Sequence, residues 1–229
     1  MALEWKEIID TTDELLKQTL SLYHSCFPEY VREDNSVFYE SIRQREKNIP
    51  NHFHFLVGVM NEKIVSFATA HYLADINSGY IVYLAADPKE RGKGYGKQTL
   101  LKMEELLGND ATHAGHPSLT GLFLETEREI DAKNEEEYRE NINRLQFFNH
   151  LGLRPVKECN YLQPPLYKEQ TPVPLYLAFK PIVSGAEPDC ERAIKAIYYE
   201  KYHKMNHVSL SVHQDCMASS RIGHKKHSV

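Results

Sequence analysis

Three glycines and three cations stand between an apolar run and a helix-like stretch in "YIVYLAADPKERGKGYGKQTLLKMEELL", residues 80–107. Glycine lets a main chain approach a ligand closely, and free N–H groups at the start of a helix attract anions. Gly92, Gly94 and Gly96 alternate strictly, and the cations are interleaved with them. This order of strand, glycines and helix predicts a site for a phosphate-bearing ligand rather than a bare tight turn.

The spacing of the glycines argues against two common nucleotide motifs. A dinucleotide fingerprint has the form G-x-G-x-x-G, and a nucleoside-triphosphate loop has G-x-x-x-x-G-K followed by Ser or Thr. Here only three residues separate Gly92 from Gly96, and Gln98 stands where the magnesium-binding hydroxyl belongs. The pattern that fits is R-x-x-G-x-G, within "ERGKGYG" at residues 90–96.

With this motif the sequence resembles the GNAT superfamily of acyl-CoA-dependent N-acetyltransferases. The stretch "LAADPKERGKGYG" is similar to the family's strand, bulge and loop, and an amphipathic helix follows it directly. Further on, "NINRLQFFNHLGL" is similar to the second family signature, an Asn-containing helix with an aromatic pair, then Gly and an apolar residue. The order of elements over residues 1–181 also matches.

The resemblance implies that acetyl-CoA is the co-substrate. Backbone N–H groups of residues 92–97 would hold its pyrophosphate, and the main chain from Leu84 to Ala86 would pair with its pantetheine arm. Asn141 falls where the family often places an asparagine near the cofactor, although a solvated helix residue is the alternative. The cofactor-binding residues implied in this way are Leu84, Ala85, Ala86, Arg91, Gly92, Lys93, Gly94, Tyr95, Gly96, Lys97, Asn141 and Phe148.

Acyl transfer from a thioester to an amine requires that the amine lose a proton, that an oxyanion be stabilised and that a thiolate leave. Our candidates for the catalytic base are Glu125 and Glu127 in "LFLETE", since residues two apart on a strand share a face. Alternatively, one or both cap the loop or pair with Arg128. No nucleophile motif stands out, which agrees with the direct transfer in a ternary complex that the resemblance implies.

The leaving group is where the sequence departs from the family pattern. Many members have a tyrosine as the second aromatic of the late helix, where it protonates the thiolate. Here the pair is Phe147-Phe148, and Phe148 can pack against the pantetheine but has no proton to give. Tyr161 and Tyr167 are possible substitutes. The departure keeps a second class of function open, a non-catalytic acyl-CoA-binding or regulatory module.

The elements that position these residues follow from apolar periodicity and turn signals. We expect a strand in "LEWKEII", helices within 11–48, and a hairpin of "HFHFLVGVM" and "IVSFATAHYLA" turning at 61–63. After the strand "GYIVYLAAD" and the helix, a polar loop at 108–121 leads to the strand "GLFLETE". The late helix ends near Gly152, and "LRPVKECNYLQ" and "VPLYLAFKPI" are two further strands.

We therefore expect an α/β fold of the α+β kind, with a mixed, mainly antiparallel GNAT-like central sheet flanked by helices, over residues 1–182. Residues 183–229 lie outside the resemblance, with a helix at 189–205 and then a polar, His-rich tail. Three tyrosines of this appended helix are expected to cover the domain or to mediate a homodimer: Tyr198, Tyr199 and Tyr202.

The composition indicates which binding partners and which cell compartment to expect. The net charge of -5 does not point to nucleic acid or to an anionic membrane, and no apolar run approaches the roughly 20 residues of a spanning helix. The cysteines form no close pair, and Cys159 is expected to pack within a strand. Scattered cysteines suit a reduced cytoplasm better than a disulfide framework, so we expect a cytoplasmic protein. The four cysteines are Cys26, Cys159, Cys190 and Cys216.

No metal is expected. His52 and His54 share one face of a strand, but no third ligand stands out, so two ordinary histidines are the preferred interpretation. The C-terminal histidines suggest either a metal-binding tail or a solvated one, and we expect the solvated tail. The function that the sequence predicts is transfer of an acetyl group to a primary amine, on a small molecule or a protein terminus.

Overall fold

The computed structural model describes residues 3–167 and 170–222. The chain folds as two units, Met1–Leu119 and Thr120–Val229. Within the described residues the units contain eight strands and six α-helices, and the strand pairs inside each unit are antiparallel. The expected mixed α/β fold with a mainly antiparallel sheet is confirmed.

The first unit opens with the strand β1 (Glu4–Glu7) and the helices α1 (Glu14–Cys26) and α2 (Asn35–Gln44). Each helix begins at an aspartate whose carboxylate accepts a first-turn N–H group. Asp13 accepts from the N–H of Leu15, and Asp34 from that of Ser36, both at 2.8 Å. The two helices expected within residues 11–48 are confirmed.

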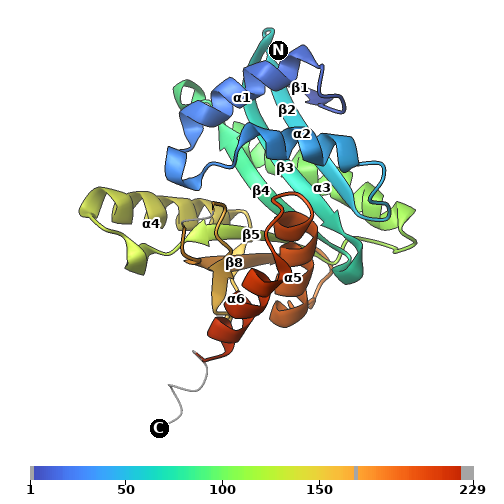
Figure 1. Cartoon of the computed structure of the whole chain (residues 1–229). Coiled ribbons are helices and arrows are strands. Elements are labelled where there is room, and N and C mark those ends of the chain that lie inside the picture. The colour runs from blue at the N-terminus through green and yellow to red at the C-terminus, as the bar shows by residue number, and fades with distance from the viewer. Residues whose placement is uncertain (1–2, 168–169, 223–229) are drawn as a thin grey trace. The chain divides into compact units, whose positions relative to one another are not determined.

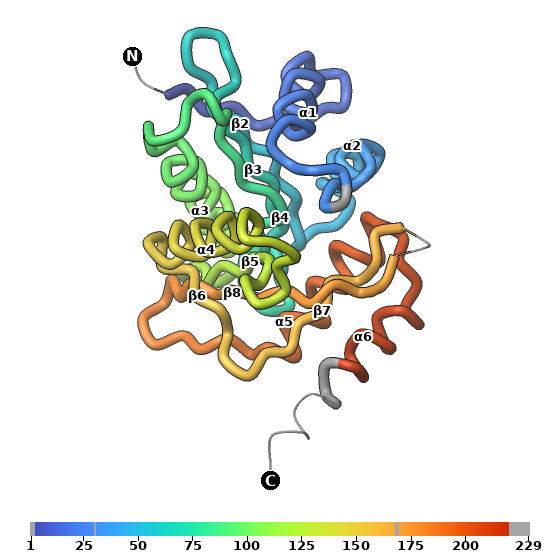
Figure 2. Tube along the Cα trace, turned by 90° about the vertical axis from the view of Figure 1, so that its left-hand side faces the viewer, coloured from blue at the N-terminus to red at the C-terminus, as the bar shows by residue number. Residues whose placement is uncertain are grey.

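The sheet of the first unit runs β1, β2 (His52–Met60), β3 (Lys63–Leu73) and β4 (Ser78–Ala86) in order. Asn61 and Glu62 close the expected hairpin with positive φ angles of 50° and 63°, as a two-residue turn of type I′ requires. Figures 1 and 2 show α1 and α2 on one face of this sheet and α3 on the other, which explains why β2 and β3 are buried along most of their length.

The helix α3 (Tyr95–His113) follows the glycine loop and is longer than the sequence suggested. Its expected apolar face is buried, with Leu100, Met103 and Leu107 at most 1% exposed. The polar loop predicted from residue 108 was wrong up to His113. Asp110 and Ala111 continue the buried face one turn further, so packing keeps this segment helical despite its polar residues.

The sheet of the second unit is built around β8 (Val173–Pro181). One side of β8 pairs with β5 (Gly121–Glu127), and two short strands also pair with it, β6 (Arg154–Pro155) and β7 (Tyr161–Gln163). The single strand expected in "LRPVKECNYLQ" is therefore split in two. Between the pieces the chain leaves the ladder, and Glu158 there has a φ of 56°.

The late helix of the second unit is α4 (Glu135–His150), which begins with three glutamates. Asn134 accepts the N–H of Glu137 at 2.9 Å, and acidic residues suit the positive end of a helix. Gly152 follows the helix with a φ of 87°, and the N–H of Leu153 returns to the carbonyl of Phe148 at 3.0 Å. The predicted C-terminal glycine is thus confirmed.

The C-terminal segment is helical well beyond the expected 189–205. The helix α5 (Cys190–Ile197) continues into a π-helical stretch, Tyr198–His203, and a further helix follows, α6 (Leu210–Ile222). The tail predicted for this region was wrong over α6, because His213 and Cys216 form a buried face there. Residues 223–229, with His224 and His227, lie outside the described residues.

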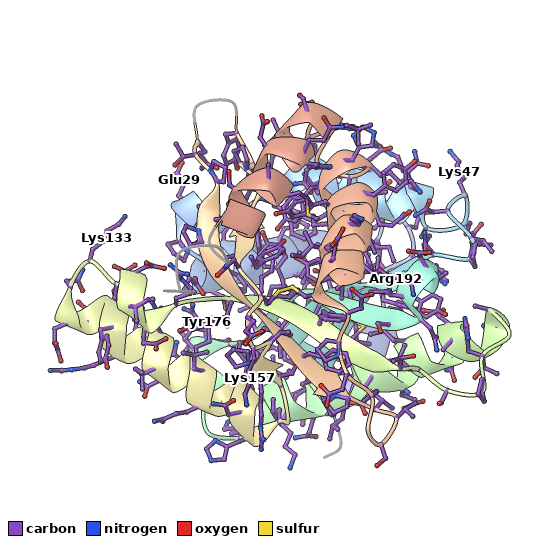
Figure 3. The ribbon with its side chains drawn as sticks, turned by 90° about the horizontal axis from the view of Figure 1, so that it is seen from below. Glu29, Lys47, Lys133, Lys157, Tyr176 and Arg192 are labelled. Atoms are coloured by element: carbon purple, nitrogen blue, oxygen red, sulfur yellow. A yellow bond between two sulfur atoms is a disulfide. The ribbon has the colours of Figure 1, made fainter. Side chains whose placement is uncertain are left out.

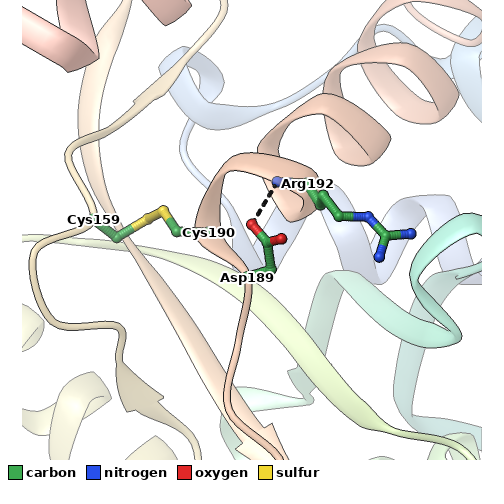
Figure 4. Close-up of a disulfide and its surroundings, with 4 residues drawn as sticks. All are labelled: Cys159, Asp189, Cys190 and Arg192. Carbon is green, nitrogen blue, oxygen red and sulfur yellow. Dashed lines mark hydrogen bonds between the residues drawn. A yellow bond between two sulfur atoms is a disulfide. The ribbon is translucent and has the colours of Figure 1, made fainter.

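The expectation that the cysteines form no disulfide was wrong for two of the four. Cys159 and Cys190, 31 residues apart in sequence, form a disulfide, and Cys159 lies in the loop between β6 and β7 rather than in a strand (Figure 4). They meet because the start of α5 returns to the loop that precedes β7. Cys26 and Cys216 are not part of this disulfide. No helix among the described residues is long and apolar enough to cross a membrane.

Candidate active site

The glycine loop of the first unit leaves β4 through a short 3-10 turn at Pro88–Glu90. Asp87 holds this turn with its carboxylate, which accepts the N–H of Lys89 at 2.9 Å. Gly92 and Gly94 have positive φ angles of 82° and 75°, in the left-handed region where other residues are strained. Two of the three alternating glycines are therefore explained by the turn itself.

Gly94 is also the N-cap of α3, and it offers no side chain to the first turn. The other helices whose N-caps are described, α1, α2, α4 and α5, all begin with a capping side chain. The first-turn N–H groups of α3 thus keep their capacity to bind an anion, at the positive end of a 19-residue helix. The chain from Arg91 to Gly94 is exposed and Tyr95 and Gly96 are half-buried, so the first turn begins at the surface of the unit.

The three cations of the loop are not equivalent. Lys93 pairs with Glu90, so its charge is already balanced. Arg91 and Lys97 are exposed, and neither makes an ion pair with any residue that the structure describes. These two side chains are consequently the cations that a phosphate would meet.

β4 has a bulge near its middle, two residues before the stretch in which the family resemblance placed one. In the register with β3, Thr69 faces Tyr83 and Ala70 faces Ile81, so Val82 is the extra residue. Beyond the bulge, the segment from Leu84 to Ala86 is half-buried and remains paired with β3. The bulge bends the strand at the point where the expected pantetheine-binding residues begin.

In the second unit, Glu125 lies at the centre of a hydrogen-bond cluster. The Tyr161 hydroxyl donates to Oε1, and the Tyr202 hydroxyl lies 2.7 Å from Oε2 and 3.0 Å from Oε1. The amide of Gln163 donates to Oε2 at 3.3 Å and to the Tyr202 oxygen at 3.1 Å. Tyr161, Tyr202 and Gln163 are all neutral donors to this carboxylate.

Glu127 has a different kind of partner. It forms an ion pair with Arg144 of α4, while Arg128, its expected alternative partner, binds Asp131 instead. The two candidate bases thus stand in different environments, one among phenols and an amide, the other against a guanidinium.

The two residues expected from the second signature are placed differently by α4. Asn141 is only 3% exposed and donates to the carbonyl of Arg128 at 3.3 Å, so the reading as a solvated helix residue was wrong. Phe148 is half-buried and Phe147 is exposed, with ring centroids 5.5 Å apart. Tyr176 of β8, labelled in Figure 3, donates to Glu129 at 3.4 Å and so binds the β5–α4 connection.

Tyrosines near Glu125 were only partly foreseen. Tyr161, offered above as a substitute acid, does contact the candidate base, whereas Tyr167 is exposed. The role of Tyr202 was missed, since the appended helix was expected to cover the domain or to mediate a dimer. The signal was present in the four-residue spacing of Tyr198 and Tyr202, which puts both rings on one helical face.

A second polar cluster, in the first unit, joins His52 and His54 to Asp110 of α3. His54 binds Asp110 through Nε2 at 2.6 Å and Glu7 through Nδ1 at 2.9 Å, while His52 Nδ1 lies 3.1 Å from Asp110. Burial alone would lower the pKa of His54, but its hydrogen bonds to Asp110 and Glu7 and their charges raise it from 6.5 to about 9.

The pKa values of the two carboxylates in this cluster, Glu7 and Asp110, are lowered, whereas that of His54 is raised. Burial alone would raise the pKa of Asp110, but hydrogen bonds from His52 and His54 outweigh it and lower that pKa. Asp110 also supplies the third potential metal ligand that the sequence did not reveal, because it lies far along the chain on α3. With both nitrogens of His54 at hydrogen-bond distance from carboxylates, the cluster is an ion-pair network.

Comparison with known proteins adds to this geometry. Residues 16–119 match the acetyltransferase (GNAT) family. No curated protein matches the chain.

Several solved structures share the fold. A protein from Bacteroides thetaiotaomicron assigned to the GNAT family is 23% identical, with a TM-score of 0.61 over 90% of this chain and 99% of its own. The ribosomal-protein-S18-alanine N-acetyltransferase of Escherichia coli is 16% identical, with a TM-score of 0.52 over 81% of this chain and 97% of its own.

An aminoglycoside 6'-N-acetyltransferase complexed with coenzyme A is also 16% identical, with a TM-score of 0.52 over 81% of this chain and 99% of its own. At these identities the structures establish the fold alone. The resemblance to the GNAT acetyltransferases predicted from the glycine loop is confirmed, by the family match over residues 16–119 and by the fold over 90% of the chain.

Proposed function

We propose that this protein is an acyltransferase that moves an acetyl group from acetyl-CoA to a primary amine, by direct transfer in a ternary complex. The observation that carries the proposal is the start of α3, where N–H groups without a capping side chain follow two left-handed glycines and lie in the same segment as the exposed cations Arg91 and Lys97. Coenzyme A carries the phosphates that suit such a site. The aminoglycoside acetyltransferase of similar fold was solved with this coenzyme.

The roles of the residues follow from their chemistry. The N–H groups of residues 92–97 bind the pyrophosphate, and the main chain from Leu84 to Ala86 pairs with the pantetheine arm. Bound acetyl-CoA supplies the activated acyl group. Glu125 accepts the proton that the amine must lose, directly or through a water molecule, because hydrogen bonds from neighbouring phenol and amide groups favour its ionised form, which can take up a proton.

A non-catalytic acyl-CoA-binding module is the second proposal, and Phe148 favours it. A phenylalanine cannot protonate the departing thiolate, whereas the family pattern has a tyrosine there. Both proposals place acetyl-CoA at the glycine loop. They differ only in whether the protein then transfers the acetyl group to an amine.

A thermal-shift series with acetyl-CoA, CoA, ATP and NAD tests the cofactor assignment. A ligand at about 100 times its dissociation constant stabilises a fold by about 2.7 kcal/mol, which such a series detects easily. We expect both coenzyme A compounds to stabilise the protein and ATP and NAD to have little effect. Equal stabilisation by all four, or by none, would refute the assignment of the loop.

A further inference from the structure

The segment beyond residue 183 reaches the candidate base. Tyr202 lies in the π-helical stretch Tyr198–His203, and its hydroxyl is 2.7 Å from the Oε2 atom of Glu125. These residues are 77 positions apart in sequence. The C-terminal helical segment therefore supplies a side chain to the carboxylate to which we assign the proton transfer.

The contact is one part of a built cluster rather than a chance surface approach. Tyr202 is 2% exposed and Tyr161 is 1% exposed, so both phenols are fixed by packing. Gln163 donates to Glu125 and also to the Tyr202 oxygen, which orients that hydroxyl towards the carboxylate. Hydrogen bonds from neutral donors favour the ionised form of a carboxyl group, and a base must be ionised to accept a proton.

The π-helical stretch is anchored on β7 by a second tyrosine. The hydroxyl of Tyr198 donates to the carbonyl of Leu162, and its ring lies 5.8 Å from that of Tyr161 and 6.1 Å from that of Tyr202. In the widened helix, the N–H of Lys204 reaches the carbonyl of Tyr199 at 3.1 Å, five residues back. Such π-helical turns occur often at functional sites.

A disulfide joins the two segments that hold Glu125. Cys190 is the first residue of α5, which leads into the stretch with Tyr202, and Asp189 caps that helix through the N–H of Arg192 at 3.1 Å (Figure 4). Cys159 lies two residues before Tyr161, whose N–H donates to the Cys159 carbonyl at 3.1 Å. The cross-link thus limits how far the two tyrosine-bearing segments can separate.

We propose that Tyr202 is a positioning residue for Glu125, that residues 190–203 are therefore part of the catalytic unit, and that the Cys159–Cys190 disulfide holds them there. This inference rests on the proposed function. The phenols of Tyr161 and Tyr202 contact Glu125, Tyr198 interacts with it electrostatically, and β8 pairs Leu177 with it. Phenols ionise near pH 10, so they act as neutral donors at neutral pH.

The test compares Tyr202→Phe with Tyr199→Phe, a matched change on the same stretch whose ring is 48% exposed. We expect Tyr202→Phe to lower kcat roughly tenfold or more, as the loss of a hydrogen bond to a charged group implies. The acid limb of its pH profile should move to higher pH, with KM for acetyl-CoA unchanged. Tyr199→Phe should match the wild type. If both variants keep the wild-type kcat and acid limb, Tyr202 has no positioning role.

A second readout does not depend on activity, so it separates failure of this inference from failure of the proposed function. In protein with ¹³C-labelled glutamate, with Glu125→Gln to assign the signal, the titration midpoint of Glu125 is measured by NMR. It should rise in Tyr202→Phe and stay at the wild-type value in Tyr199→Phe. An unchanged midpoint in Tyr202→Phe would overturn the inference even in an inactive protein.

The disulfide is tested with Cys190→Ser, and Cys26→Ser serves as the thiol control outside this cluster. Hydrogen exchange of the amides from 190 to 203 should speed up in Cys190→Ser, and kcat should fall, while Cys26→Ser leaves the exchange unchanged. Wild-type exchange and turnover in Cys190→Ser would show that the tyrosines hold the segment without the cross-link.

Discussion

The Nε2 atom of His54 lies 2.6 Å from the Oδ2 atom of Asp110, and the same ring binds Glu7 on its other side. Only a doubly protonated imidazole donates at both nitrogens. The raised pKa of His54, about 9, means that this ring is an imidazolium at neutral pH. The link holds α3, which begins at the glycine loop, against β2.

The first prediction is a loss of stability at alkaline pH. Because the folded pKa of His54 lies above its ordinary 6.5, its stabilisation is complete below about pH 6.5 and is lost as pH rises through about 9. The difference corresponds to about 3 kcal/mol. Urea denaturation at pH 6.5 and pH 9.5 measures it. His54→Gln should remove most of this loss, and the exposed control His24→Gln should retain it. A flat profile in the wild type would contradict the prediction.

Gly94→Ala and Gly108→Ala form a second, matched pair on α3. An added Cβ would meet nothing within 4 Å at Gly108, and at Gly94 it would meet only the Gln98 amide, 3.9 Å away. The two positions differ in backbone conformation, because Gly94 has a positive φ and Gly108 does not. We expect Gly94→Ala to destabilise the fold by about 1 kcal/mol and to weaken coenzyme A binding. Gly108→Ala should instead stabilise it by about 0.5–1 kcal/mol and leave binding unchanged. Denaturation measures the two changes in stability, and calorimetric titration measures the affinity for coenzyme A. Equal coenzyme A affinities in the two variants would show that Gly94 is not part of the binding site.

The two free cations of the loop provide the third prediction. Arg91→Ala and Lys97→Ala should each weaken coenzyme A binding several-fold, and the effect should shrink at high salt because the contacts are exposed. Lys93→Ala should have a smaller effect, since Lys93 already pairs with Glu90. Calorimetric titrations at low and high salt test this order, with the exposed Lys17→Ala as control. A Lys93→Ala variant that binds more weakly than the other two would reverse our assignment.

The fourth prediction concerns the two carboxylates of β5, Glu125 and Glu127. Glu125→Gln should lower kcat by roughly 10²–10⁴-fold and leave acetyl-CoA binding intact, as the loss of a general base implies. Glu127→Gln removes a half-exposed ion pair with Arg144 and should cost at most about 1 kcal/mol of stability. Steady-state kinetics and denaturation of both variants test this contrast. Unchanged turnover in Glu125→Gln would remove that residue from the mechanism.

Much of the fold was predictable because its signals are local. Asn61 and Glu62 mark a hairpin turn, and Gly152 marks a helix end, each within a few residues of the element it bounds. The glycine loop is equally local, so its position before α3 followed from spacing alone.

What could not be predicted depends on contacts between distant segments. The cluster at Glu125 joins β5 to Tyr202, and the disulfide joins Cys159 to Cys190. The spacing of Tyr198 and Tyr202 indicates a shared helical face, but nothing in the sequence indicates that this face meets Glu125 or that Cys159 meets Cys190. The same holds for α6, where the polar letters of a tail conceal the buried face of His213 and Cys216. Tertiary packing decided these segments, against their composition.

The most direct test of the central claim is release of coenzyme A from acetyl-CoA in the presence of a panel of primary amines. Chromatography should quantify the coenzyme, because the half-buried thiol of Cys26 lies outside the disulfide and would also react with a thiol reagent. Mass spectrometry should identify the acetylated amine. We predict release with at least one amine, and a loss of that release in Glu125→Gln. Binding of acetyl-CoA with no release from any amine would contradict acyl transfer and leave the acyl-CoA-binding module as the function of this protein.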